Sequence, residues 1–220
     1  MRHEVVAIDG PAGAGKSTVA RRLAQRLGFI YLPSGNFYRA LAWRALDQGT
    51  PLDDEDALAR LADRLDIDVR PVGDGWRTFV GARDVTARLD GSAVSDVASR
   101  ISVFPRVRER MVALQRRVAE RGPVVAEGRD MASVVFPETE HAFYLDATVA
   151  ERARRRAIDL RARGEEADEA SLAAEIARRD ERDTSRDAAP LRQTDGAVRI
   201  DTTSLTIEEV VERLLEELGR

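Results

Sequence analysis

The sequence predicts an α/β protein in which a mostly parallel sheet is flanked by helices and interrupted by a small antiparallel insert. Two observations support this. Short apolar runs alternate with helical patterns along most of the 220 residues, and a glycine-rich turn separates the first apolar run from the first helical pattern. A third sets the insert apart: near residues 65–100 the pattern changes to alternating polar and apolar residues around Gly73-Asp74-Gly75, which is typical of a hairpin.

The first strand and the first helix are the best defined elements. Residues 5–8 form a short apolar run rich in β-branched residues, as in a buried parallel strand. A helix is predicted over 17–27, because Val19, Leu23 and Leu27 recur at four-residue spacing and Gly28 can end it. Strand, glycine turn and helix in this order are the context that a phosphate-binding loop requires.

The other elements follow from the same signals. In chain order we expect a strand at 29–32, a helix at 34–48 capped by Ser34, the insert at about 65–100, a helix at 105–121 opened by Pro105, strands at 124–126 and 141–145, charged helices at 150–163 and 171–187, a strand at 198–200 and a helix at 207–218. We expect one domain over 1–220, with a core at 1–64 and 101–220.

Composition narrows the class of protein. The formal net charge is −4, which argues against a nucleic-acid binder unless a local basic patch compensates. The absence of cysteine excludes disulfides and thiolate metal sites and agrees with a cytoplasmic location. No long apolar run follows the N-terminus or occurs elsewhere, so neither a signal peptide nor a membrane span is expected. We expect a monomer.

The glycine turn contains the chain's one lysine. Of 35 basic residues only Lys16 is not arginine, and it occupies the lysine position of G-x-x-x-x-G-K-[ST] in the segment 10–17. A compact ammonium on a flexible stem can follow a moving phosphoryl group, whereas a guanidinium prefers a bidentate fork. The loop is therefore predicted to surround the phosphates of a nucleoside triphosphate, with Lys16 between the β- and γ-phosphates and the Ser17 hydroxyl on Mg²⁺.

Charged residues follow the next buried strand. Glu127 stands at its carboxyl end, where a carboxylate can hold Mg²⁺ directly or through water, or can be an ordinary acid at a strand end. Gly128-Arg129-Asp130 comes next, and an arginine beside an acid can bind a phosphate and a polar group together or form a surface ion pair.

Two arginine clusters lie in the charged helices. Arg179, Asp183 and Arg186 share one helical face in the run 178–186, and Arg152, Arg155 and Arg156 form a second cluster. Both clusters can be solvated helix faces. In a chain with a phosphate loop they can also stabilise the charge that phosphoryl transfer spreads over the equatorial oxygens.

Together these segments resemble the bacterial cytidylate kinases. The matching stretches cover nearly the whole chain in the family's order: Ile8-Asp9-Gly10-Pro11 with the phosphate loop, Ser34-Gly35-Asn36-Phe37-Tyr38-Arg39, Phe104-Pro105-Arg106-Val107-Arg108, Gly128-Arg129-Asp130-Met131 with Val134-Val135-Phe136-Pro137, Leu145-Asp146-Ala147, and residues 179–183 with Arg186. The phosphate loop is common to many kinases, whereas the Gly-Arg-Asp-Met and Phe-Pro-Arg-Val-Arg elements together are specific.

The resemblance implies a P-loop kinase fold and a role for each matching residue. It assigns catalysis to Lys16, Arg129, Arg182 and Arg186. It assigns ATP binding to Gly10, Pro11, Ala12, Gly13, Ala14, Gly15, Lys16, Ser17, Thr18, Arg152 and Arg155, with Mg²⁺ at Ser17 and Glu127. For the acceptor CMP it implies Ser34, phosphate binding by Arg39, Arg129 and Arg186, cytosine recognition by Ser99, Arg108 and Asp130, and ribose binding by Arg179 and Asp183. The resemblance also implies that the insert is the nucleoside-monophosphate-binding region and that residues 150–187 form a lid over ATP.

The chain departs from the family at two positions. Pro33 precedes Ser34 where the family usually has aspartate, and Ala132 follows Gly-Arg-Asp-Met where glycine is frequent. Proline fixes its own φ and removes a donor, so Pro33 bears on how Ser34 is placed.

The implied reaction transfers a phosphoryl group from ATP to CMP or dCMP, with Mg²⁺ as cofactor and without a covalent enzyme intermediate. The nearest alternative is another small P-loop kinase that acts on UMP or on a hydroxylated metabolite. A GTPase is excluded because its Asn-Lys-x-Asp element needs a second lysine. A nucleic-acid binder is disfavoured by the net charge and by the lack of interleaved aromatic and basic residues.

Overall fold

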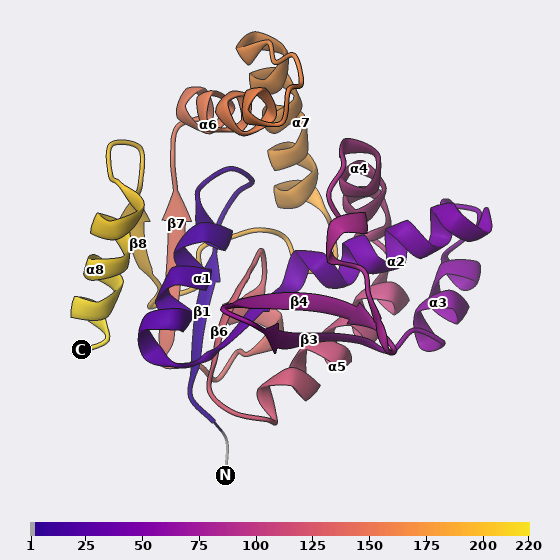
Figure 1. The fold of residues 1–220 in the computed structure, drawn as a ribbon, viewed down its shortest axis with the longest axis horizontal. Helices are drawn as coiled ribbons and strands as arrows, with labels where there is room; N and C mark the ends of the chain where they lie inside the picture. Colours follow the sequence, from indigo (N-terminus) through magenta and orange to yellow (C-terminus); the bar gives the residue numbers. More distant parts are fainter. Residues whose placement is uncertain (1–2) are drawn as a thin grey trace. The chain divides into compact units, whose positions relative to one another are not determined.

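The computed structural model describes residues 3–220 and has the predicted α/β fold (Figure 1). The main sheet has five strands in the order β2-β6-β1-β7-β8, and a second sheet has three strands in the order β3-β4-β5. The chain divides into two compact units. The first unit comprises Phe29–Ala126 with the residues up to Val5, and the second comprises Val6–Gly28 and Glu127–Arg220.

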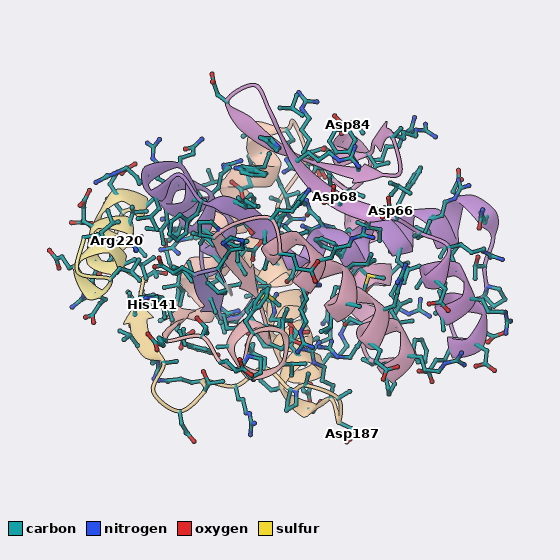
Figure 2. The ribbon with its side chains drawn as sticks, turned by 90° about the horizontal axis from the view of Figure 1, so that it is seen from below. Asp66, Asp68, Asp84, His141, Asp187 and Arg220 are labelled. Carbon is teal, nitrogen blue, oxygen red and sulfur yellow. The ribbon has the colours of Figure 1, made fainter. Side chains whose placement is uncertain are left out.

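The first unit contains the insert. Its elements are β2 (Ile30–Pro33), α2 (Ser34–Gln48), α3 (Glu55–Asp63), β3 (Ile67–Val72), β4 (Gly75–Val80), β5 (Arg83–Asp84), the short 3-10 helix η1 (Thr86–Arg88), α4 (Ser92–Ile101), α5 (Pro105–Ala119) and most of β6 (Val124–Gly128). Strands β3 and β4 pair antiparallel, as predicted, and β5 adds a third antiparallel strand beside β4. Asp66, Asp68 and Asp84 mark this small sheet in Figure 2, and Asp68 accepts hydrogen bonds from Arg70 and Arg121.

The second unit contains the glycine turn and the charged helices. Its elements are β1 (Val5–Asp9), α1 (Lys16–Leu27), the single-turn π-helix η2 (Met131–Val135), β7 (His141–Asp146), α6 (Val149–Ala162), α7 (Glu169–Ser185), β8 (Val198–Asp201) and α8 (Ile207–Glu217). β7 pairs in parallel with β1 and with β8, so that Asp9 is level with Tyr144, and Asp146 with Asp201. The carboxyl ends of these strands therefore form one edge, where ligands bind in open α/β sheets.

Apolar side chains fill the interior of each unit. In the first unit Phe37, Leu41 and Ile101 are completely buried. In the second, Ile8 and Leu23 are completely buried, and α1 contacts α8 while α6 contacts α7 (Figure 1). The helical spacing of apolar residues on α1 therefore marks the face that the protein buries, as the sequence pattern indicates.

Some expected elements differ from those observed. Ser34 does not cap α2: Pro33 is the N-cap residue, no side chain caps the helix, and Ser34 is its first helical residue. Helix α3 was not among the expected elements, although Asp54 caps it by accepting from the N–H of Ala57. The insert is not entirely β, because it also contains α4. Helix α5 ends at Ala119, shortly before the predicted end.

Within residues 3–220 no helix is both long enough and apolar enough to cross a membrane.

Candidate functional site

Three glycines shape the turn between β1 and α1. Gly10, Gly13 and Gly15 have φ values of 147°, 80° and 89°, which favour glycine. At Gly10 a side chain would also collide with the strand beside it, because a Cβ would lie 2.0 Å from the carbonyl oxygen of Leu145. The turn can therefore keep this shape only with glycine at these positions.

The turn leads directly into the N-terminus of α1. Gly15 is the N-cap residue, so no side chain caps the helix. The first N–H groups of a helix have no partner within the helix, and together with the helix dipole they favour an anion. An uncapped twelve-residue helix behind a glycine turn is thus suited to bind phosphate.

Lys16 lies at the first position of α1 and is buried, with 5% of its surface exposed. Its Nζ donates to the carbonyl oxygen of Pro11 over 2.7 Å, which folds the ammonium back over the turn. Burial, assisted by the positive charge of Arg129, lowers the pKa of Lys16 to about 7. An incoming phosphate would favour the charged form and raise that pKa again.

Two further side chains hold the carbonyl groups of the turn. Arg152 of α6 is buried and donates to the carbonyl oxygens of Ala12 and Ala147, and its third bond goes to Asp180 of α7 over 2.6 Å. Thr202, after β8, donates from Oγ1 to the carbonyl oxygen of Ala14 over 3.2 Å. These bonds connect the turn to both charged helices and to the end of β8.

Ser17 and Glu127 form the candidate magnesium site. The Ser17 hydroxyl donates to Oε1 of Glu127 over 2.9 Å, and Glu127 is buried at the end of β6. A hydroxyl and a carboxylate are oxygen donors of the kind that Mg²⁺ prefers, and Mg²⁺ usually keeps several of its waters. Among residues 3–220 there is no group of three or more His, Cys, Asp or Glu side chains that could hold a metal. The pair therefore fits a metal that is bound mainly by water and phosphate.

Arg129 and Asp183 form an ion pair. Nε of Arg129 donates to Oδ2 of Asp183 over 2.8 Å, and the two side chains are 18% and 8% exposed. Burial alone would raise the pKa of Asp183, but the charge and hydrogen bond of Arg129, together with the charges of Arg179 and Arg186, lower that pKa. The family resemblance places these two residues on different parts of the acceptor, and the structure brings them into contact.

Asp130 is buried beside Arg129. It is the N-cap residue of η2, and the N–H groups of Val134 and Val135 donate to its carbonyl oxygen. The next two N–H groups, of Met131 and Ala132, both donate to the carboxylate of Asp9. The loop that carries Asp130 is therefore held to the end of β1.

The remaining predicted residues of the second unit lie on α1 and around the charged helices. Thr18 is exposed on α1. Arg155 binds Glu151 and donates to both oxygens of Thr202, so its guanidinium already has protein partners. Arg179 and Arg182 lie on α7, and Arg186 is its C-cap residue, with Nε donating to the carbonyl oxygen of Ala189 over 2.7 Å.

The first unit holds the other predicted residues. Ser34 is buried at the start of α2, and the guanidinium of Arg39 lies over Gly35 and bonds to Asn36. The ligand roles of these residues stay predictions.

Two further residues of the first unit form a polar cluster near the end of α4. Arg108 is 5% exposed, donates to the carbonyl oxygen of Ser102 over 3.1 Å and lies 5.8 Å from the ring centre of Tyr38. Ser99 is also buried, and among the described residues its hydroxyl has no hydrogen-bond partner. A buried hydroxyl without a partner is unfavourable, so the cluster is suited to receive a polar ligand.

Sequence reasoning did not assign roles to Asp9, Thr202 and Asp180. Each acts on a segment far away in the chain: Asp9 on Met131, Thr202 on Ala14, and Asp180 on Arg152. Only for Asp9 was there a local signal, since it ends a buried strand next to the glycine turn. The other two contacts depend on how the chain returns to the turn, which no local pattern indicates.

Comparisons with known proteins show which family the chain belongs to. The cytidylate kinase family model matches residues 6–220. A protein named "Cytidylate kinase" from Symbiobacterium thermophilum is 48% identical over 220 residues, covering 100% of this chain and 97% of that protein. Another of the same name from Geobacillus kaustophilus is 49% identical over 211 residues, with 96% of this chain and 94% of that protein covered.

A solved structure shows the same fold at low sequence identity. It is an uncharacterized protein from Eubacterium ventriosum, with a TM-score of 0.52, 10% identity, and 98% of each chain covered. The family itself is established by the sequence comparisons: the chain belongs to the cytidylate kinases, which are ATP-dependent nucleoside monophosphate kinases.

Proposed function

We propose that this protein transfers the γ-phosphoryl group of ATP to CMP or dCMP and releases ADP with CDP or dCDP. The observation that carries the proposal is the buried Lys16 in a glycine turn, within a chain that matches cytidylate kinases over its full length. The alternative acceptors, UMP or a hydroxylated metabolite, are not favoured, because the relatives are named for cytidylate.

The donor side of the reaction rests on the turn between β1 and α1. The N–H groups at the start of α1 bind the phosphates of ATP, and Lys16 neutralises the charge that develops on the transferred group. Ser17 and Glu127 would hold Mg²⁺, Glu127 through water. When bound, the metal neutralises phosphate charge and aligns the phosphoryl group. When ADP release is followed with CMP as the acceptor, omitting Mg²⁺ should abolish turnover. In the same assay, Glu127→Gln should raise the Mg²⁺ concentration needed for half-maximal rate.

The family resemblance assigns acceptor roles to residues in each unit. In the second unit Arg129 and Arg186 bind the phosphate of CMP, Asp130 accepts from the amino group of cytosine, and Arg179 and Asp183 bind the ribose. In the first unit Arg108 and Ser99 contact the base, and Ser34 and Arg39 bind the acceptor as well. Arg182 adds positive charge during transfer, and Arg152 and Arg155 serve ATP binding. These roles rest on the family resemblance and on the burial of half of these side chains, namely Ser34, Ser99, Arg108, Asp130, Arg152 and Asp183.

The charged helices act as a lid. Helices α6 and α7 contact each other, and few of their residues are buried. A segment with a small apolar contact area opens at low free energy, so we expect residues 150–187 to close over ATP and exclude water. The insert at 65–100 is the acceptor-binding region. We expect a monomer that works in the cytoplasm, where ATP and nucleoside monophosphates are available.

One assay tests the proposed function. ADP release is followed with CMP, dCMP, UMP, AMP and GMP as acceptors in the presence of ATP and Mg²⁺. CMP and dCMP should give the highest kcat/KM. A higher value for UMP, AMP or GMP, or turnover that is independent of any nucleotide acceptor, would contradict the proposal.

A further inference from the structure

Asp9 makes an unusual contact for a residue at the end of a strand. It is 3% exposed, and its two carboxylate oxygens accept from two consecutive backbone N–H groups, Oδ1 from Met131 over 2.8 Å and Oδ2 from Ala132 over 2.9 Å. Hydrogen bonds to an ionised acceptor are stronger than those to a neutral one. The carboxylate therefore fixes the orientation of two adjacent peptide groups.

Those peptide groups determine where Asp130 points. Met131 and Ala132 begin η2, and Asp130 is the residue before them, with φ −150° and ψ 25°. From the other side, the N–H groups of Val134 and Val135 donate to the carbonyl oxygen of Asp130. The main chain around Asp130 is thus held both by η2 and by the carboxylate of Asp9, which binds the two N–H groups that follow it.

Asp9 itself is held in place by its surroundings. It lies opposite Tyr144 in the parallel pairing of β1 with β7. The next residue, Gly10, approaches the carbonyl oxygen of Leu145 so closely that no side chain fits there. A carboxylate on such a rigid support can position another loop accurately, which is the requirement for a well-ordered binding site.

Asp9 lies where burial disfavours an ionised carboxylate. Burial raises the pKa of Asp9 to about 6, and the charge of Asp130 also raises it. The two backbone hydrogen bonds and the charge of Lys16 lower that pKa. The pKa of Asp9 therefore depends on the charge of Asp130, which is predicted to recognise the base, and on the charge of Lys16 in the phosphate loop. Strongly shifted groups are frequent at functional sites.

We propose that Asp9 is a positioning residue for the acceptor base: its carboxylate fixes the main chain at Asp130 so that the Asp130 side chain faces the amino group of cytosine. The inference rests on the proposed function, because it needs CMP as the acceptor. It assigns to the end of the phosphate-loop strand a part in acceptor choice as well as in ATP binding.

The test is Asp9→Asn, assayed with CMP and with UMP. An amide can accept only one of the two N–H groups and presents an NH₂ donor to the other, so the loop is released while the shape is kept. A lost bond to a charged acceptor corresponds to a loss of about 10- to 100-fold. We expect kcat/KM for CMP to fall by about that factor, chiefly through KM, while UMP changes by less than about threefold and KM for ATP by less than about twofold.

A matched control removes a carboxylate from the end of the neighbouring strand. Asp146 ends β7 and accepts from the N–H of Ala147 and from Arg199, so its side chain is engaged away from residues 130–132. Asp146→Asn should leave the ratio of kcat/KM for CMP to that for UMP unchanged. Melting temperatures of both variants confirm that each assay is run on folded protein.

A second variant tests the same contact from the other side. Ala132→Pro removes the N–H that donates to Oδ2 of Asp9, and its melting temperature shows whether the single turn of η2 accepts the proline. It should lower the ratio of kcat/KM for CMP to that for UMP, as Asp9→Asn does. If Asp9→Asn does not fold, this variant alone tests the contact between Asp9 and the loop.

The outcomes separate the inference from the function on which it rests. A wild-type protein that does not phosphorylate CMP ends the proposed function, and the inference with it. A wild type active on CMP, with an equal fall for CMP and UMP in the variants or an effect on KM for ATP alone, overturns the inference only. Asp9 would then support the phosphate loop and have no part in base choice.

Discussion

Asp183 of α7 accepts from Nε of Arg129 over 2.8 Å, which joins α7 to the residue that follows β6. The carboxylate thereby orients the guanidinium, which also donates from Nη1 to the carbonyl oxygen of Gly128. Because both side chains are mostly buried, removing one partner leaves the other with an uncompensated charge.

We therefore expect Asp183→Ala to lower the free energy of unfolding by about 3 kcal/mol. Urea denaturation at pH 7 measures this. The control is Asp84→Ala, which breaks the more exposed pair with Arg77 and should change the free energy by less than about 1 kcal/mol. Since the folded pKa of Asp183 is lowered from 3.8, its stabilising effect is present above that value and is lost on further acidification. Equal losses in the two variants would show that the Arg129 pair contributes no more than a surface pair.

Lys16 should take up a proton when ATP binds. Its pKa is lowered to about 7 without ligand, so at pH 8 most of the side chain is neutral. Phosphates stabilise the charged form, and binding should then draw up to about one proton per site from solution. Calorimetry of ATP binding in two buffers of different ionisation enthalpy measures the uptake, and Lys16→Met should abolish it. Identical heats in both buffers for the wild type would contradict the prediction.

Lys16→Arg should keep the positive charge and lose the reaction. A guanidinium is bulkier than an ammonium and cannot occupy the same place over the carbonyl oxygen of Pro11. Lys16→Ala should abolish turnover as well. We expect kcat to fall at least about 100-fold in both variants, with the circular dichroism spectrum unchanged. Wild-type rates in Lys16→Arg would show that the single lysine has no special role.

Asp130 should decide between cytosine and uracil. An ionised carboxylate can accept from the amino group of cytosine, whereas it repels the carbonyl oxygen that uracil has at that position. Asp130→Asn and Asp130→Ala should therefore lose far more kcat/KM for CMP than for UMP. The measurement is steady-state kinetics with both nucleotides. If both acceptors suffer alike, Asp130 only accompanies Arg129 as a structural carboxylate.

The stability difference between wild type and Asp9→Asn should depend on pH. Because the pKa of Asp9 is raised from 3.8 to about 6, the folded state binds a proton more tightly than the unfolded state. The wild type consequently loses about 3 kcal/mol between those two values as the pH rises, whereas the amide of the variant does not titrate. Melting temperatures from pH 4.5 to 7.5 should shift in favour of the variant with increasing pH. A constant difference would mean that Asp9 is not a buried acid of this kind.

Local signals in the sequence were sufficient for the alternating core. The glycine turn with its following helix, the Pro105 start of α5 and the antiparallel strands around Gly73 were all predicted, because each depends on neighbouring residues. Helix α4 was not expected although Val97, Ala98 and Ile101 lie on one face, since the hairpin pattern before it dominated the interpretation.

The sequence proposes the site as a set of residues, and the structure shows which of them lie in contact; their ligand roles stay predictions. The contact of Ser17 with Glu127 agrees with the metal pair proposed from sequence. By contrast, Asp9 and Thr202 act on residues more than a hundred positions away, and such contacts follow from the parallel crossovers of the sheet. Capping rules predicted that Ser34 is the N-cap residue of α2. The N-cap residue is Pro33 instead, and its side chain has no hydrogen-bond acceptor.

Because the chain has a single lysine, proteolysis can measure how readily the phosphate loop unfolds locally. A protease specific for lysine finds one peptide bond in this chain, between Lys16 and Ser17. That bond lies at the start of α1 beside a side chain that is 5% exposed, so cutting requires the turn to unfold locally. The rate at which the intact chain disappears therefore reports the opening of this one loop, and its retardation by a nucleotide would measure how firmly the ligand closes it.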